Sequence, residues 1–147
     1  MKKKTVKAPA KKLATPRKKA AAPKRSSAKI YNSESLAKII AQGMAEKKAE
    51  KIAILDLRKI TGAPADFFVI SHATSDKQVE AIADSAEEEV KKTTGETPGH
   101  REGYANLEWV LLDYFDVVAH VFKVEKRDFY AVEDLWGDAK IIKFKAS

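Results

Sequence analysis

The sequence predicts an α+β domain, built as a single mixed β-sheet with helices packed on it. Two observations predict this fold class. Residues 34–48 and 75–92 carry apolar side chains at helical spacing. Short β-prone runs follow each of these segments, at residues 52–57, 66–71 and 109–122. The resulting order of helix, strand, strand, helix, hairpin and helix favours one mixed sheet covered by helices.

A basic segment precedes this domain. Residues 1–30 carry twelve of the 28 Lys and Arg residues and no acid, which leaves 16 basic residues against 21 acids, a net charge of −5, in residues 31–147. The segment has too few apolar side chains to offset its ordering entropy, so we expect it to be disordered. Two interpretations stand, a solubility extension or a segment that contacts RNA phosphates. The candidate contact residues are Lys11, Lys12, Arg17, Lys18, Lys19, Lys24 and Arg25.

The domain itself, residues 31–147, is predicted to begin with an amphipathic helix and two strands. The apolar side chains that define the helix are Leu36, Ile39, Ile40 and Met44, with Ser33 as the predicted N-cap. Residues 52–57 form a β-prone run and residues 66–71 a second one, separated by a loop that contains Gly62 and Pro64.

A second helix follows these strands. Ser75 and Gln78 have the spacing of a capping box, in which each side chain satisfies a free backbone amide of the other residue. One apolar face then continues to about residue 92, through Val79, Ile82, Ala83, Ala86 and Val90. Residues 93–103 are predicted to form a polar loop.

Residues 109–122 are predicted to form a β-hairpin. A two-residue turn at 114–115 would pair Asp113 with Asp116, Leu111 with Val118, and Trp109 with His120. These six side chains share one face, here called the hairpin face. The opposite face is uniformly apolar and is the predicted core side, with Val110, Leu112, Val117, Ala119 and Val121.

The hairpin face has two interpretations. Its mixture of an indole, aliphatic groups, an imidazole and two carboxylates is unusual for solvated surface, and aromatic anchors on such faces are typical of binding hot spots. For Trp109, Leu111 and Val118, the alternative is burial under a helix or a dimer partner. For His120, a solvated imidazole and an interface hydrogen-bond partner both fit. Phe129, Tyr130 and Trp136 follow on a predicted short helix, where core packing is expected.

The sequence predicts no catalytic, metal-binding or cofactor-binding residues, and we expect a protein that is not an enzyme. The absence of cysteine excludes disulfides and thiolate metal sites. Asp56 and Asp66 lack the partner carboxylates and the Gly-Ser loop that metal-dependent nucleotidyl transfer requires. Three other residues, Ser71, His72 and Asp76, lack the strand–turn–helix context of an activated serine. No third ligand accompanies His100 and His120 at a metal-binding spacing.

The chain is expected to be cytoplasmic and not to enter a membrane. No apolar run approaches the roughly 18–20 residues needed to span a bilayer, and the lysines at the start are not followed by the apolar stretch of a secretory signal. A mitochondrial location fits less well, because the basic segment is rich in Lys rather than Arg and is interrupted by Pro9, Pro16 and Pro23.

Six ordered blocks of the chain resemble the ribosomal silencing factor (RsfS, or Iojap) family. They span about three quarters of the sequence and lie at residues 65–71, 78–84, 102–103, 109–114, 116–122, and 127–130 through 133–136. The resemblance implies a small α/β domain with a nucleotidyltransferase-like topology. It further implies binding to the large ribosomal subunit, at the ribosomal protein conventionally numbered fourteen, and a steric block to joining of the small subunit. No cofactor is implied.

The resemblance makes the hairpin face the expected contact with that ribosomal protein and the basic segment a possible contact with ribosomal RNA. A basic-tailed RNA-binding or ribosome-assembly factor is the alternative function, and a homodimer of the free protein is possible on the same hairpin face. One position departs from the family pattern. Phe115 stands where the family usually has Gly, and a non-Gly residue at positive φ costs roughly 1 kcal/mol or more.

Overall fold

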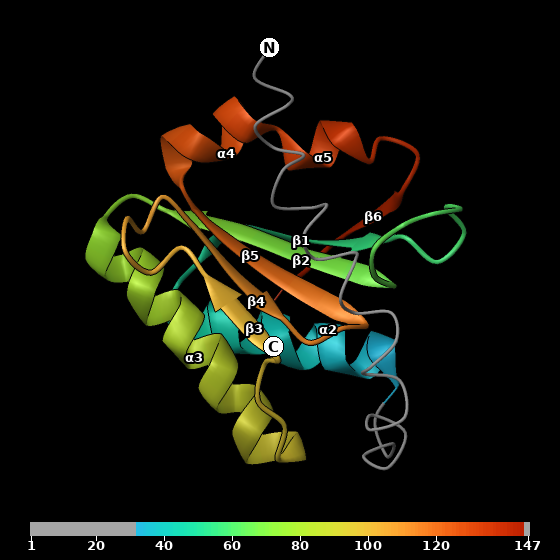
Figure 1. Ribbon diagram of the computed structural model, residues 1–147. Helices are drawn as coiled ribbons and strands as arrows, with labels where there is room; N and C mark the ends of the chain where they lie inside the picture. Colours follow the sequence, from blue (N-terminus) through green and yellow to red (C-terminus); the bar gives the residue numbers. More distant parts are fainter. Residues whose placement is uncertain (1–31, 146–147) are drawn as a thin grey trace.

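The structure, a computed structural model, describes residues 32–145 and has three layers (Figure 1). A six-stranded sheet in the order β3-β4-β5-β2-β1-β6 forms the middle layer. Helices α2 (Ser33–Glu46) and α3 (Asp76–Thr94) cover one face, and the short helices α4 (Val124–Tyr130) and α5 (Val132–Leu135) cover the other. The predicted α+β class is confirmed. The predicted disordered segment, residues 1–30, lies outside the described residues.

The sheet is mixed because one central pair is parallel. Its strands are β1 (Glu50–Asp56), β2 (Phe67–Ala73), β3 (His100–Glu102), β4 (Trp109–Asp113), β5 (Val117–Lys123) and β6 (Lys140–Lys143). Strands β2 and β5 run parallel, with Phe67 opposite Val117. The other four neighbouring pairs are antiparallel. Among residues 32–145, no helix is both long enough and apolar enough to cross a bilayer.

Two apolar cores flank the sheet. The larger core joins α2 and α3 to the face that carries Val110, Leu112, Val117, Ala119 and Val121, as the alternation of residues predicts. The smaller core lies under α4 and α5 and includes Leu55, Phe68, Leu111, Val118 and Phe122. Both faces of the central strands are therefore buried, and every residue of β2 is buried.

The helix starts agree in part with the predicted caps. Asn32, not Ser33, is the N-cap of α2, because its Oδ1 accepts a hydrogen bond from the Ser35 amide at 2.8 Å. The Ser33 hydroxyl instead donates to Asp66 Oδ2 at 2.9 Å. Ser75 caps α3 as predicted. The Gln78 side chain does not return to the cap. It donates to the Lys47 carbonyl at 3.1 Å and so ties α3 to the end of α2.

The hairpin register differs from the predicted one by two residues. Trp109 pairs with Phe122, Leu111 with His120 and Asp113 with Val118. The connection closes with a hydrogen bond from the Tyr114 amide to the Val117 carbonyl at 2.9 Å. Phe115, which stands where the family usually has Gly, has φ 73°. The Asp113 carboxylate accepts the Phe115 amide at 2.8 Å and stabilises this conformation.

Three short elements were not predicted. The polar loop contains β3, and the chain ends with β6, which pairs with β1 at the far edge of the sheet. The predicted single C-terminal helix is two helices, separated at Ala131 in a left-handed conformation with φ 45°. This break turns α5 back along the sheet face toward β6 (Figure 1).

Candidate binding site

Helices α4 and α5 cover most of the hairpin face. The exposed fractions of Leu111, Val118 and His120 are 2 %, 0 % and 3 %. Asp113 is 4 % exposed, while Trp109 is half-buried and Asp116 is exposed. The expectation of an open hairpin face is therefore wrong for its centre, and burial under a helix is the interpretation that holds. The sequence alone does not indicate that two helices as short as α4 and α5 would pack there.

The imidazole of His120 belongs to the smaller core. The Trp109 indole donates from Nε1 to His120 Nδ1 at 3.0 Å, so the neutral ring carries its proton on Nε2. The ring packs against Phe68 with centroids 4.5 Å apart. Burial lowers the pKa of His120 to about 3. His120 is thus a neutral core residue that orients Trp109, and neither role predicted for it from the sequence describes it.

An aromatic ladder runs from this core to the surface of α4. It consists of Phe122, Trp109, Tyr130 and Phe129. The ring centroids of Trp109 lie 5.1 Å from Phe122 and 4.7 Å from Tyr130. Phe129 meets Tyr130 edge-on at 5.0 Å and is 46 % exposed. The prediction that Phe129 and Tyr130 are core residues is therefore wrong for Phe129, which the ladder holds at the surface.

Arg127 attaches α4 to the sheet and to α5. Arg127 is buried, with an exposed fraction of 9 %. Nη1 donates to the Lys51 carbonyl of β1 and to His72 Nδ1 of β2, each at 2.9 Å. Nε and Nη2 bind the two oxygens of Glu133 in α5 at 3.1 and 2.7 Å. Sequence reasoning missed this role, because nothing in a single Arg on a short helix indicates burial.

His72 is held neutral by this arrangement. Nδ1 accepts from Arg127, and Nε2 lies 3.3 Å from Glu50 Oε1, to which it donates. Burial and then the positive charge of Arg127 lower the pKa of His72 below 6.5, and these effects outweigh the opposite effect of Glu50. Protonation would place a second N–H against the guanidinium.

We expect the free energy of unfolding to fall with acidification partly through His72. Because the pKa is lower in the folded chain, stability is complete above about pH 6.5 and is lost as the pH falls from there toward the folded pKa. The variant His72→Asn retains an acceptor but does not titrate. Urea unfolding from pH 7.5 to 5 should give a shallower pH dependence for His72→Asn. Equal slopes would show that His72 does not contribute, since His120 titrates alike in both chains.

The residues that the sequence analysis considered and rejected for catalysis make structural contacts. Ser71 donates to Met44 Sδ at 3.2 Å inside the core. Asp56 binds Arg58, whose hydrogen bonds lower the pKa of the carboxyl. Ser71, His72 and Asp76 do not form a catalytic arrangement, because His72 is committed to Arg127 and Asp76 pairs with Lys123 at 2.5 Å. Within residues 32–145, no group of three or more His, Asp or Glu side chains is placed to hold a metal ion.

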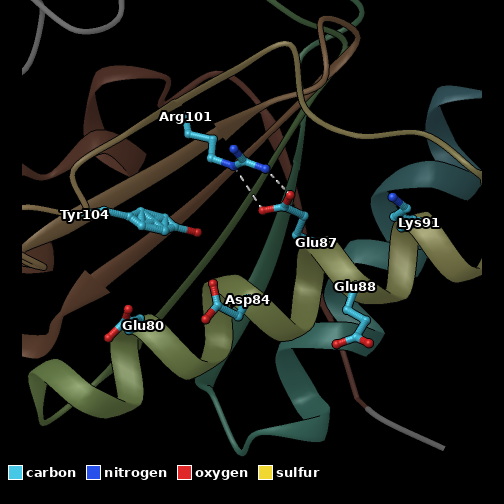
Figure 2. A pocket seen from close by; sticks show the side chains of 7 residues that line it. All are labelled: Glu80, Asp84, Glu87, Glu88, Lys91, Arg101 and Tyr104. Carbon is cyan, nitrogen blue, oxygen red and sulfur yellow. Dashed lines mark hydrogen bonds and ion pairs between the residues drawn. The ribbon is translucent and has the colours of Figure 1, made fainter.

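A separate surface pocket of about 560 Å³ lies between α3 and the β3 edge (Figure 2). Arg101 binds the Glu87 carboxylate with two nitrogens, and the Tyr104 ring extends over Asp84. Burial and the neighbouring carboxylates of Glu80 and Glu87 raise the pKa of Asp84. Four carboxylates and two cations, Lys91 and Arg101, line the pocket, and Arg101 is already paired with Glu87.

Residues 30–147 match the family model described as "Ribosomal silencing factor during starvation". The chain belongs to this family. Among its relatives, the ribosomal silencing factor of Bacillus subtilis is 42 % identical over 75 % of this chain and 92 % of its own length. The chloroplastic protein Iojap of Zea mays is 34 % identical over 71 % of this chain and 45 % of its own length.

Solved structures share the fold of this chain. A crystal structure from Chromobacterium violaceum superposes with a TM-score of 0.68 at 32 % identity, covering 73 % of this chain and 88 % of that one. A second, from Bacillus halodurans, gives a TM-score of 0.65 at 35 % identity, with coverages of 77 % and 100 %. The resemblance stated from the sequence blocks is thus confirmed. The silencing factors are named for a regulatory role in translation, which is the class of function predicted.

Proposed function

We propose that this chain binds the large ribosomal subunit through the ribosomal protein conventionally numbered fourteen and sterically prevents joining of the small subunit. The match of residues 30–147 to the silencing-factor family carries this proposal. The mechanism is competition for a surface, so it requires no cofactor and no chemical step. The chain would act in the cytoplasm, where the two subunits meet.

Charge supports a protein rather than an RNA as the partner of the folded domain. Residues 31–147 have a net charge of −5, and ribosomal proteins are commonly basic. The basic residues of the N-terminal segment would then approach nearby ribosomal RNA, and tethering would add affinity without a second specific site. Trp109 and Asp116 are the predicted contact residues that reach the surface of the described structure, and they remain candidates.

The first test is co-sedimentation with purified large and small subunits, followed by a subunit-joining assay. The proposal expects binding to the large subunit alone and fewer joined ribosomes. Equal binding to both subunits that salt abolishes would instead identify an RNA-binding protein, the second candidate, which the twelve basic residues of the N-terminal segment favour.

Deletion of residues 1–30 separates the two candidates. A silencing factor is expected to retain large-subunit binding with a shallower dependence of affinity on salt, because fewer phosphate contacts are lost with rising ionic strength. An RNA-binding protein is expected to lose binding. The double substitution Trp109→Ala with Leu111→Ala is a poor test of the interface, because truncating a Leu that is 2 % exposed would cost about 2–5 kcal/mol of stability.

A further inference from the structure

We propose that the outer surface of α4 is the docking face of this protein, with Phe129 as its anchor. The docking face comprises Phe129, Tyr130 and Trp109 with the flanking carboxylates Glu125 and Asp128. Its partner is a basic protein surface that offers an apolar pocket for one aromatic side chain. This inference rests on the proposed function and names the surface and the chemistry through which the ribosomal protein is bound.

The first observation that supports the docking face is the exposure of Phe129. Of the large apolar side chains described, only Phe129 and Ile141 are exposed, at 46 % and 47 %. Phe129 lies beside Tyr130, and Tyr130 lies against Trp109, whose Nε1 is fixed by His120. The exposed ring is thus the outer end of an aromatic ladder rooted in the core. A ring held in this way loses little conformational entropy on binding, which is a property of hot-spot anchors.

The second observation is the rigid attachment of α4 to the rest of the domain. Arg127 lies on the inner side of the same helix and donates to β1, to β2 and to Glu133. The helix that presents Phe129 is therefore fixed at one residue to three other elements. A binding surface on a fixed element is better preorganised than one on a loop.

Charge identifies the partner. The exposed charged side chains of α4, α5 and residues 136–139 are all carboxylates, namely Glu125, Asp128, Asp134 and Asp138. The cations of the same helices are less available. Lys126 is half-buried, lying 5.4 Å from the Phe129 ring and 4.0 Å from Glu108, and Arg127 is buried against Glu133. A carboxylate rim repels phosphate and attracts Lys and Arg, so the docking face fits a basic protein and not an RNA.

Large-subunit co-sedimentation of Phe129→Ala, with Ile141→Ala as matched control, tests the anchor. Removing a hot-spot aromatic is expected to weaken binding about 30-fold, and removing the equally exposed Ile141 less than about 2-fold. Both side chains are half exposed, so circular dichroism and urea unfolding should show folded variants. Wild-type affinity for Phe129→Ala, or an equal loss for Ile141→Ala, would overturn the docking face while leaving the proposed function in place.

Asp128→Lys tests the rim, with substitution of the exposed Glu88 of α3, Glu88→Lys, as control. Asp128→Lys is expected to weaken large-subunit binding about 10-fold at low salt, with the difference shrinking as salt screens it. Tighter binding by Asp128→Lys would mean that the face meets RNA and would overturn the proposal. Sedimentation equilibrium measures self-association. If Asp128→Lys weakened self-association but not large-subunit binding, the face would be a dimer contact and the proposal would be overturned. Failure of the unaltered chain to bind large subunits would overturn the proposed function and the docking face together.

Discussion

Gly103→Ala is expected to lower the free energy of unfolding by about 3 kcal/mol or more, the sum of two separate costs. Gly103 has φ 93°, in the region that L side chains rarely adopt. A Cβ there would lie 2.0 Å from the Trp109 carbonyl oxygen and 2.9 Å from Val110 Cα. Both atoms belong to the backbone of β4, which is paired on both sides and cannot retreat alone. Urea denaturation of the purified variant measures the loss.

Gly62→Ala is the matched control for this prediction. Gly62 has a similar φ of 81° but nothing within 4 Å of the added Cβ, so only the conformational cost of about 1 kcal/mol applies. The difference between the two variants therefore isolates the clash with β4. If Gly103→Ala lost no more stability than Gly62→Ala, residues 103–108 would have to move away from β4 freely. Gly103 would then not determine the path of the chain into β4.

Arg127→Met is expected to lower the free energy of unfolding by about 3 kcal/mol, the low end for breaking a buried ion pair, because Glu133 is 29 % exposed and keeps some hydration. The methionine would fill similar space but would leave the Lys51 carbonyl, His72 and Glu133 without their donor. The loss should appear in urea unfolding at pH 7, with the largest rise in amide exchange in α4 and α5, which Arg127 connects to the sheet.

Lys126→Met on the same helix is the control for Arg127→Met. Lys126 is half-buried and makes a 4.0 Å ion pair with Glu108, for which a change within about 1 kcal/mol is expected. Similar free energies of unfolding for both variants would mean that the attraction between Arg127 and Glu133 only offsets the free energy that desolvating the two charges costs. In that case apolar contacts with Val132 and Trp136 would hold α4 and α5 on the sheet.

The sequence predicts which side chains share a face more reliably than which residues pair. The predicted hairpin register is wrong by two residues, yet the residues of β4 and β5 lie on the faces assigned to them, since side chains alternate with a period of two. Asp116 is the exception, because it lies in the turn. The turn lies at residues 115–116 and not at 114–115, and it places Phe115 at a positive φ that is unfavourable for a non-Gly residue. The hydrogen bond from its amide to Asp113, which compensates for that cost, depends on the final fold.

The exposure of a face and the existence of edge strands depend on contacts that a single sequence does not display. Helices α4 and α5 are too short to show a helical period, so burial of Leu111 and Val118 under a helix was one of two open interpretations, and burial of His120 was not predicted. Strand β3 has three residues, all polar, and β6 has four residues, of which two are apolar. They are strands because β4 and β1 offer free edges beside them, which is a tertiary effect.

The parallel pairing of β2 with β5 has a consequence for folding during synthesis of the chain. Phe67 of β2 lies opposite Val117 of β5, so about fifty more residues must be synthesised after β2 before this neighbouring strand exists. Until then β2, buried along its whole length in the finished fold, presents an open row of backbone donors and acceptors. A nascent or truncated chain that stops before β5 is therefore prone to aggregate through β2. Both edges of β2 are paired only after the last third of the protein has left the ribosome that made it.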